Sequence, residues 1–335
     1  MNERGHTRPA REAVVVIADI LAARRAIGDR LHRTPFFSSE RTSARAGSRV
    51  MLKAELLQRT GSFKPRGALA KLATLSRKER RNGVVAASSG NHAQALAYCA
   101  REFGIECVAV MWEGVSPQKI AATRSYGATV DLESADGVEA LSRARDLAES
   151  TGMVFVHAYD DPAVIAGQGT LGLEILEDVP DVDAIVVPVS GGGLIAGIAV
   201  AVKASRAHTK IVAVEPESSP SLALALAAGH PVPVPPASIA DSLGAPSIGA
   251  FCLSVVAPLV DEVIHVTDDE IRHATAWLYQ SAKLACEPAG AASTAALLSG
   301  RIRFSPTSNV VAVVSGGNID PIEIAELLAP AASVS

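Results

Sequence analysis

Short β-rich runs alternate with alanine-rich segments of helical character along most of this chain, beginning at Val50. This alternation is typical of α/β proteins, in which helices connect parallel strands and cover the faces of the sheet. Ile185-Val186-Val187 is apolar at successive positions, as expected for a strand buried on both faces. We therefore predict an α/β fold with largely parallel sheets. The predicted strands are Val50–Leu52, Val84–Ala87, Cys107–Met111, Thr129–Leu132, Val154–His157, Ala184–Val189, Ile211–Glu215, Glu262–Val266 and Val310–Ser315.

The length of 335 residues is typical of two domains. Residues 12–32 have the apolar spacing of a helix, and residues 329–335 are expected to be a frayed tail. The uncharged stretch Ala184–Val202 is long enough to span a membrane. It contains Pro188 and three successive glycines, however, which a helix facing lipid does not tolerate well. A buried strand, a tight turn and a buried helix explain this stretch better.

Charge and cysteine content exclude several classes of partner. The net charge of −4 gives no electrostatic reason to expect a nucleic-acid partner, and the run Arg77–Arg81 reads as a solvated helix end. The four cysteines show no CxxC spacing, so neither a zinc site nor disulfides are expected. The polar N-terminus lacks the pattern of a signal peptide. A reducing, cytoplasmic setting without a membrane partner is therefore predicted.

Lys64 is the first candidate catalytic residue, in the segment Thr60-Gly61-Ser62-Phe63-Lys64-Pro65-Arg66-Gly67. Threonine, glycine and serine are turn and N-cap residues, and they place Lys64 in the first turn of a helix. The partly positive helix terminus lowers the pKa of an amine there, which helps the amine to form an imine. A solvated surface lysine is the alternative explanation.

Two predicted turns between a strand and a helix are rich in small residues. The exposed backbone amides of Ser88-Ser89-Gly90-Asn91-His92 suit a carboxylate or a phosphate. In Ser190-Gly191-Gly192-Gly193-Leu194, the glycines let the backbone approach a ligand, and the helix terminus favours a phosphate dianion. The patterns GxGxxG and GxxxxGK(S/T) are absent, which argues against a dinucleotide fingerprint or a P-loop. Ordinary packing turns are the alternative for both segments.

Ser315 ends the last predicted strand, at the carboxyl end where parallel sheets bind ligands. Together with Lys64 and the two turns, it completes a set of an amine, a carboxylate nest, a phosphate cup and a hydroxyl. These are the groups that pyridoxal 5′-phosphate (PLP) and an amino-acid substrate require.

The chain resembles the fold-type II PLP-dependent enzymes, and within them the threonine/serine dehydratase and serine racemase branch. The motifs that carry the resemblance are, in chain order, SFKPRGA, SSGNHAQA, DDPAVIAGQGTLGLEI, SGGGLIAG, VEPE, CEPAGA and SGGNID, and they cover nearly the whole chain. The resemblance implies a tryptophan synthase β-like α/β fold with parallel-rich twisted sheets flanked by helices. It also implies a large PLP-binding domain (residues 1–68 and 158–330), a small mobile domain (residues 69–157) and a tail (residues 331–335).

The resemblance implies a role for each matching residue. Lys64 would hold PLP as a Schiff base and later remove the Cα proton of the substrate. Phe63 would pack near the cofactor ring, Asn91 would hydrogen-bond its O3′ and Ser315 would meet its pyridine nitrogen. The substrate carboxylate would be held by Ser88, Ser89, Asn91 and His92, and the cofactor phosphate by Ser190, Gly191, Gly192, Gly193 and Leu194.

Ser89 is the position at which this branch of the family divides. In the racemases the matching residue is a serine that acts from the face opposite the lysine, so Ser89 is expected to be catalytic in any racemisation. Helix capping by Ser89 is the structural alternative. Glu139 lies where an ungapped comparison would put the racemases' substrate-contacting arginine, which favours a dehydratase.

A cation site is expected only in a modified form. Glu215 matches the glutamate of the racemases' divalent-ion site, whereas Ser221 stands where they have an aspartate. Glu215, Ser219 and Ser221 are therefore candidate ligands for a monovalent cation or for a weakly bound divalent one.

The predicted function is that of a PLP-dependent ammonia-lyase, a dehydratase that converts a small L-β-hydroxy amino acid into a 2-oxo acid and ammonia by β-elimination. A serine racemase, or a mixed racemase and dehydratase, is the alternative. The alternative from another class is a non-catalytic ligand-binding protein on the same scaffold. Serine, threonine, hydroxyaspartate, phenylserine and a hydroxyectoine-pathway compound all stay open as substrates. The resemblance also implies a homodimer.

Overall fold

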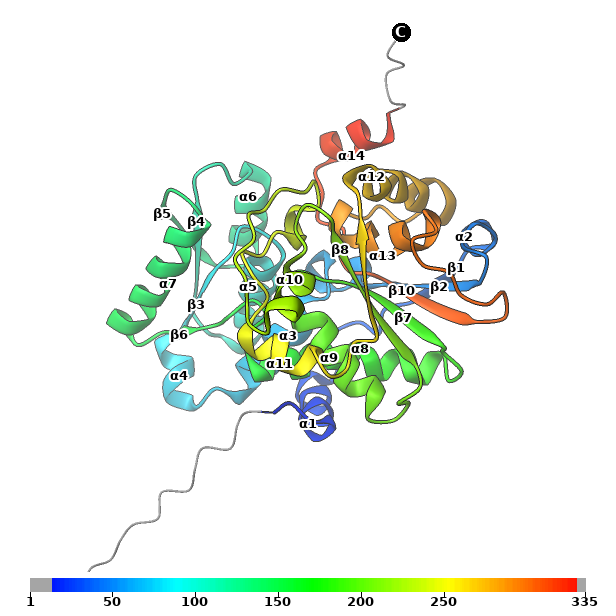
Figure 1. Ribbon diagram of the computed structural model, residues 1–335. Helices are drawn as coiled ribbons and strands as arrows, with labels where there is room; N and C mark the ends of the chain where they lie inside the picture. Colours follow the sequence, from blue (N-terminus) through cyan, green and yellow to red (C-terminus); the bar gives the residue numbers. More distant parts are fainter. Residues whose placement is uncertain (1–13, 330–335) are drawn as a thin grey trace, which may run out of the picture.

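The computed structural model describes residues 14–329, which form two sheets that lie side by side (Figure 1). The larger sheet has the strand order β1-β2-β10-β7-β8-β9, and β1 alone is antiparallel to its neighbour. The smaller sheet has the order β5-β4-β3-β6, and all of its strands are parallel. The predicted α/β fold with parallel-rich sheets is therefore confirmed.

The strands are β1 (Phe36–Ser38), β2 (Arg49–Ala54), β3 (Val84–Ala87), β4 (Cys107–Trp112), β5 (Thr129–Ser134), β6 (Val154–Phe155), β7 (Ala184–Pro188), β8 (Lys210–Pro216), β9 (Glu262–Val266) and β10 (Asn309–Val314). The helices are α1 (Ile17–Ile27), α2 (Glu40–Ala46), α3 (Lys64–Thr74), α4 (Arg77–Asn82), α5 (Asn91–Phe103), α6 (Pro117–Ser125), α7 (Gly137–Thr151), α8 (Pro162–Asp178), α9 (Gly193–Lys203), α10 (Ser221–Ala228), α11 (Ala250–Val256), α12 (Asp268–Trp277), α13 (Pro288–Leu298) and α14 (Pro321–Leu328). Every predicted strand is present to within two residues at each end, and β1 is an additional short strand.

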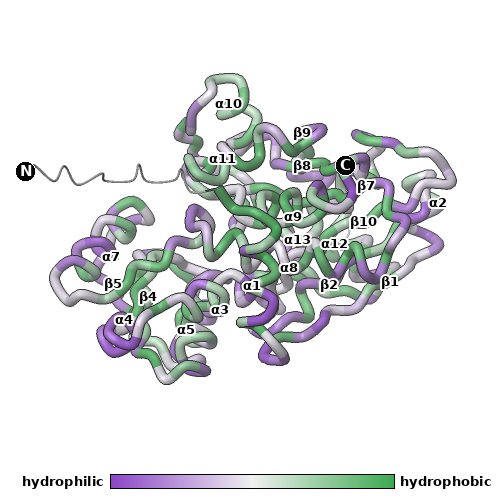
Figure 2. The backbone as a smooth tube through the Cα atoms, turned by 90° about the horizontal axis from the view of Figure 1, so that it is seen from below, coloured by the Kyte–Doolittle hydropathy of each residue, from purple (hydrophilic) through white to green (hydrophobic). Residues whose placement is uncertain are grey.

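Both faces of the larger sheet are covered by helices, which is why its central strands are apolar at every position. On β7, Ile185 and Val187 pack against α1, α8 and α9. Ala184 and Val186 point the other way, into a second cluster formed with α12 and α13. Figure 2 shows the corresponding concentration of hydrophobic residues along α8 and α9.

The smaller sheet is covered in the same way. Val84 and Ala86 of β3 face α3 and α5, whereas Val85 faces α7. The charged run Arg77–Arg81 lies in α4 at the edge of the molecule, where all but one of its residues are exposed, as predicted (Figure 2). Each sheet thus has its own hydrophobic core.

Further predictions concern the apolar stretch Ala184–Val202, the two ends of the chain and the cysteines. Ala184–Val202 is divided between β7, a glycine turn and α9, and no helix within residues 14–329 is long and apolar enough to cross a membrane. The helix predicted for residues 12–32 is shorter, because α1 ends at Gly28. Residues 12–13 and the predicted tail, 331–335, lie outside the described residues. All four cysteines are free and buried.

The division into two domains stays a prediction. The strands of the smaller sheet come from residues 84–155, and those of the larger sheet from the segments on either side. Helix α3 continues from Lys64 to Thr74 across the first predicted boundary, at residues 68 and 69. Any relative movement of the two parts would therefore carry or bend the helix that begins at Lys64.

Candidate active site

Lys64 is the first residue of α3, as predicted, and its Nζ donates a hydrogen bond to the carbonyl oxygen of Ala158 at 3.0 Å. The predicted reason for the helix start was wrong, because the N-cap is Phe63 and no side chain caps the helix. The backbone N–H of Phe63 instead donates to the carbonyl oxygen of Ser315 at 3.1 Å. The end of β10 therefore positions the turn that carries Lys64.

The electrostatic environment favours the neutral form of the Lys64 amine. Burial is the main cause and lowers the pKa of Lys64 to about 8, although Cys252 and Glu287 act in the opposite direction. The predicted cause, the positive field of a helix terminus, is not the main one. The Phe63 ring lies beside the amine, with its centroid 5.1 Å from Nζ. Near neutral pH about a tenth of such an amine is unprotonated, far more than for an exposed lysine, and this fraction is able to attack a carbonyl.

The turn between β3 and α5 presents free hydrogen-bond donors. The helix begins at Asn91, and its N-cap, Gly90, makes no side-chain capping bond. In the described part of the chain, the backbone N–H groups of Ser89, Asn91 and His92 donate to no other residue. Ser88 Oγ accepts the N–H of Gly90 at 3.3 Å. These free N–H groups are of the kind that an anion requires, and their binding of a carboxylate stays a prediction.

Two side chains of this turn differ in what they can do. His92 is buried, its Nε2 lies 3.0 Å from the carbonyl oxygen of Val156, and burial lowers the pKa of His92 to about 3. Its ring is therefore neutral and has a structural role. Ser89 is half-buried, and its hydroxyl forms no hydrogen bond to another residue within 14–329. Helix capping, the structural explanation for Ser89, is therefore excluded.

The glycine turn between β7 and α9 forms a second group of free donors. Gly192 is the N-cap of α9 and has a φ of 93°, which strongly favours glycine. In the described chain, the N–H groups of Gly191, Gly192, Gly193 and Leu194 make no backbone hydrogen bond, and no side-chain acceptor meets them. Ser190 is fixed separately, since its Oγ accepts the N–H of Ala245 at 3.0 Å.

Tyr159 packs on the glycine turn and follows the residue that Lys64 contacts, and it was not among the predicted site residues. The residue follows Ala158, which accepts the hydrogen bond from Lys64, and its ring lies where a Cβ atom on Gly191 would be. Its hydroxyl donates to the carbonyl oxygen of Ser247 at 3.2 Å. Any side chain at position 191 would therefore collide with Tyr159, which directly follows Ala158, the hydrogen-bond acceptor of Lys64.

Asn91 is held by two residues that the sequence analysis did not single out. Its Nδ2 donates to Glu287 Oε1 at 2.7 Å, and its Oδ1 accepts from Asn318 Nδ2 at 2.6 Å. Asn318 also donates to the carbonyl oxygen of Thr60, in the turn before Lys64. Glu287 is a lone charged residue in the apolar segment Ala285–Ala289, which is a signal that sequence reasoning can use.

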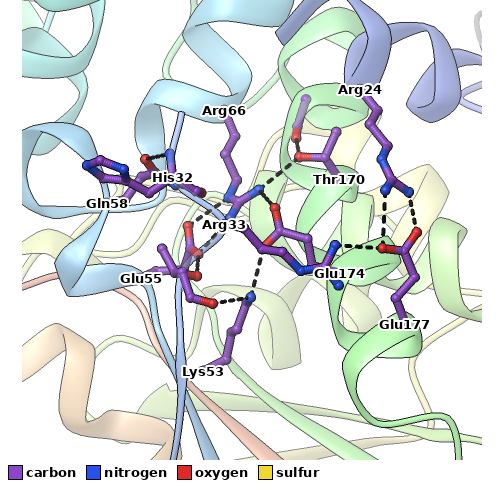
Figure 3. Close-up of polar contacts among 12 residues, drawn as sticks. Arg24, His32, Arg33, Lys53, Glu55, Gln58, Arg66, Thr170, Glu174 and Glu177 are labelled. Carbon is purple, nitrogen blue, oxygen red and sulfur yellow. Dashed lines mark hydrogen bonds and ion pairs between the residues drawn. The ribbon is translucent and has the colours of Figure 1, made fainter. Parts of the chain in front are cut away.

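Helix α3 contributes Arg66 to a buried cluster of charged side chains (Figure 3). Arg66 is two residues after Lys64, and its guanidinium lies between Glu55 and Glu174, with ion pairs of 2.8 and 2.7 Å. Lys53 also pairs with Glu174, at 2.8 Å, and donates to the carbonyl oxygen of Thr34. Lys53 and Glu55 are 0% exposed and Arg66 is 2% exposed, so these charges depend on one another for compensation.

The candidate cation ligands are already engaged in hydrogen bonds. Glu215 Oε1 accepts from Leu222 N and from Ser221 Oγ, and its Oε2 accepts from Ala223 N. The hydroxyl of Ser219 donates to a backbone carbonyl. Burial raises the pKa of Glu215 to about 7, and no group of three or more metal-ligating side chains lies within the described residues. This set fits a cation poorly, because both oxygens of Glu215 already accept hydrogen bonds from the first turn of α10 and the hydroxyl of Ser219 is hydrogen-bonded to Pro235.

Comparisons with known proteins agree on one family. The family model described as "Pyridoxal-phosphate dependent enzyme" matches residues 27–316. The chain is 44% identical to the L-threonine ammonia-lyase of Thermotoga maritima over 309 residues, which cover 92% of this chain and 76% of that protein. It is 39% identical to the catabolic L-threonine dehydratase of Escherichia coli K12 over 315 residues, which cover 93% and 96% of the two chains.

Solved structures agree in fold with this assignment. The structure of maize serine racemase has a TM-score of 0.90 at 37% identity and covers 94% of this chain and 97% of its own. The processed form of threonine deaminase isoform 2 from Solanum lycopersicum has a TM-score of 0.86 at 34% identity and covers 94% and 92%. With the amine, the β3–α5 turn and the glycine turn in place, these matches show that the chain belongs to the pyridoxal-phosphate dependent enzymes, with the fold of their threonine deaminase and serine racemase members.

Proposed function

We propose that this enzyme is a dehydratase that converts a small L-β-hydroxy amino acid, threonine or serine, into a 2-oxo acid and ammonia. The observation that carries the proposal is the position of Lys64, whose pKa is lowered by burial and whose amine is bound to the carbonyl oxygen of Ala158. The next residue, Tyr159, packs on the glycine turn, and the charge of Lys64 acts on His92 of the β3–α5 turn. The relatives named as threonine ammonia-lyase and threonine dehydratase, at 39–44% identity, support the same reaction.

The residues present fit PLP, as judged from the donors that the fold leaves free. The glycine turn offers several N–H groups at a helix N-terminus, as a phosphate dianion requires, and Gly192 supplies the backbone conformation. Ser315 is 5% exposed at the end of β10, where its hydroxyl would meet the pyridine nitrogen. Phe63 would pack near the cofactor ring and Asn91 would donate to O3′. PLP, when bound, supplies an electron sink that makes the Cα proton of an amino acid acidic.

The chain's own residues would then perform the proton chemistry. When its Nζ is not bound to the cofactor, Lys64 would be a free amine able to take the Cα proton. The β-hydroxyl would leave as water, so that H⁺ is lost from Cα and OH⁻ from the neighbouring carbon. Hydrolysis of the released product would consume one water and give the 2-oxo acid and ammonia. One side chain therefore serves first as the attachment point and then as the base.

The β3–α5 turn would hold the substrate at its carboxylate end. The N–H groups of Ser89, Asn91 and His92, with the hydroxyl of Ser88, form a nest at the N-terminus of α5 that suits a carboxylate. His92 contributes through its backbone, because its ring is engaged with Val156. Held by its carboxylate, the substrate would be oriented for the loss of the Cα proton.

Racemisation is the second candidate, and the free hydroxyl of Ser89 favours it. This hydroxyl is not used in capping α5 and is available as a second acid/base group. The structural similarity to maize serine racemase is consistent with such a role. Racemisation would need Lys64 and Ser89 to act at opposite faces of Cα, whereas dehydration needs only the lysine.

A product assay tests the proposal. Purified enzyme with PLP is given L-serine, L-threonine, L-threo-3-hydroxyaspartate and L-phenylserine, and the 2-oxo acid and D-amino acid are both measured. We expect 2-oxo acid from threonine or serine with little D-isomer. A D-isomer formed at a comparable rate would establish the racemase, and neither product would contradict both candidates.

Three further assignments belong to this proposal. We propose a cytoplasmic homodimer, supported by the resemblance to the family and tested by sedimentation and by fractionation of cells. For the candidate site of Glu215, Ser219 and Ser221 we propose at most weak binding of a monovalent or divalent cation, because the oxygens are engaged in hydrogen bonds.

A further inference from the structure

We propose that Glu287 is a positioning residue for the reaction, which fixes the orientation of the Asn91 amide beneath the cofactor site. The inference rests on the proposed function, in which Asn91 contacts PLP. Asn91 and Glu287 are 196 positions apart in the chain, yet their side chains are buried together, with 2.7 Å between Nδ2 and Oε1.

The hydrogen bonds around Asn91 permit one amide orientation. Asn318 Nδ2 is a donor only, so it must face the oxygen of the Asn91 amide. Asn318 cannot be turned around, because the same nitrogen donates to the carbonyl oxygen of Thr60 at 2.7 Å. Glu287 Oε1, when ionised, is an acceptor only and must face the nitrogen. A flipped Asn91 would therefore bring two donors together on one side and two acceptors together on the other.

The carboxylate of Glu287 has a second partner in Ser242. Its Oε2 accepts from Ser242 Oγ at 3.2 Å, and Ser242 also lies 3.4 Å from Asn91 Nδ2. The backbone N–H of Glu287 donates to the carbonyl oxygen of Gly316, next to Ser315. The backbone of Glu287 is thus bound to the segment that follows β10, and its carboxylate to the loop around Ser242.

The carboxylate of Glu287 packs closely against Gly316. A Cβ atom on Gly316 would overlap Glu287 Oε1 and lie 3.3 Å from Asn91 Nδ2. The carboxylate therefore occupies the space between Gly316, which follows Ser315, and the amide of Asn91. Asn91 and Ser315 are the two residues proposed to contact the cofactor ring.

The charge of Glu287 is sensitive to pH near neutrality. Burial raises the pKa of Glu287 to about 7, and hydrogen bonds from Asn91 and Ser242 oppose that effect. Above this pH the carboxylate makes a charge-assisted hydrogen bond to Asn91, which is stronger than a neutral one. The charges of Asp241 and Lys119 also change the pKa of Glu287. The charge of Glu287 in turn raises the pKa of Lys64, Lys119 and Cys286.

The test measures PLP binding to the full-length apoenzyme, together with the absorption band of the bound cofactor, in three variants. Glu287→Ala removes the acceptor, and we expect the dissociation constant of PLP to rise about 10-fold or more and the band to shift. Glu287→Gln can still accept from Asn91 through its amide oxygen, so a smaller rise is expected. The difference in the PLP dissociation constant between Glu287→Gln and wild type should be largest above pH 7, where Glu287 is ionised. Ser293→Ala is the matched control, a buried α13 residue whose hydroxyl has no partner among the described residues, and it should change neither readout.

A double-mutant cycle determines whether Glu287 acts through Asn91. If it does, Glu287→Ala should change the binding constant and the band less than about twofold in the Asn91→Ala background. Independent, additive effects of the two substitutions would overturn the inference. Should Glu287→Ala fail to fold, Asn318→Ala disturbs the same amide from the other side and is combined with Asn91→Ala in its place.

The outcomes separate this inference from the proposed function. If Asn91→Ala leaves PLP binding and the absorption band unchanged, the assignment of Asn91 to the cofactor site is wrong and both proposals fall. If Asn91→Ala changes them while Glu287→Ala and Glu287→Gln do not, the positioning role of Glu287 alone is refuted.

Discussion

The amino group of Lys64 donates a hydrogen bond to the carbonyl oxygen of Ala158 across 3.0 Å. This bond connects the first residue of α3 to the segment that leads from β6 to α8, where Tyr159 packs on the glycine turn. The lysine is therefore oriented by backbone, and its position does not depend on an acidic partner.

Replacing Lys64 with alanine should abolish both the imine absorbance of the bound cofactor and the elimination of threonine. We expect a loss in kcat of about 10³-fold or more, because the same side chain supplies the attachment point and the base. Absorption spectra and a 2-oxo acid assay measure the two effects. Lys71→Ala is the control, since Lys71 lies on the same helix but pairs with Asp161. Full activity of Lys64→Ala would contradict the assignment.

The rate at which PLP attaches to the apoenzyme should depend on pH with a midpoint near 8. Attachment requires the neutral amine, and the pKa of Lys64 is lowered to about 8 by burial. The rate should rise with pH through about 8 and level off above about pH 9, and stopped-flow absorbance measures it. An exposed lysine would show a rate that continues to rise toward pH 10, and such a profile would refute the effect of burial.

Ser89→Ala should spare the dehydration of L-threonine and remove any racemisation of L-serine. The hydroxyl of Ser89 caps no helix, so its loss should not disturb α5. Dehydration is expected to stay within about threefold of wild type, whereas formation of D-serine should fall by about 10²-fold or more. Chiral analysis of the products measures both. An equal loss of the two activities would contradict the division of labour between Lys64 and Ser89.

Arg66→Met should lower the free energy of unfolding by about 3–5 kcal/mol, because it leaves Glu55 buried without its charged partner. Urea denaturation measures the change. The control is Arg24→Ala, which removes a surface ion pair to Glu177 and should cost less than about 1 kcal/mol (Figure 3). If the two substitutions lowered the free energy of unfolding by similar amounts, the charges of the buried cluster would not depend on one another for compensation.

Cations should have little effect on the thermal stability of the wild-type enzyme. Both oxygens of Glu215 are engaged by the first turn of α10. Ser221→Asp places a second carboxylate beside Glu215, and the melting temperature of this variant should rise when Mg²⁺ or Ca²⁺ is added. Scanning calorimetry with and without the ions measures the shift. A rise for wild type of the same size would restore the cation site.

The strands could be predicted from sequence because a buried parallel strand is a local pattern. Ile185 and its neighbours are apolar whichever helices cover them, so no knowledge of the partners is needed. β1 lacks such a signal, because it has three residues, none of them buried, and pairs with β2 alone among the described strands. The start of α3 was placed correctly for a wrong reason, since a backbone contact to Ser315 replaces the expected side-chain cap.

In the candidate site, too, local features could be predicted from the sequence and contacts between distant residues could not. The two turns with free N–H groups were predictable, because small residues between a strand and a helix form a local signal. The contact of Asn91 with Glu287 was not, because it joins residues 196 positions apart. The pKa of Lys64 likewise depends on burial in the folded chain, which a local pattern does not contain.

The overlap of a Cβ atom at position 316 with the carboxylate of Glu287 also limits how this enzyme can evolve. A mutation that gives residue 316 a side chain forces the Glu287 carboxylate away from Asn91, and this displacement is avoided if a shorter residue has first appeared at position 287. The two positions are therefore epistatic, and the order of substitutions matters. A laboratory lineage selected for a new substrate should change position 287 before position 316.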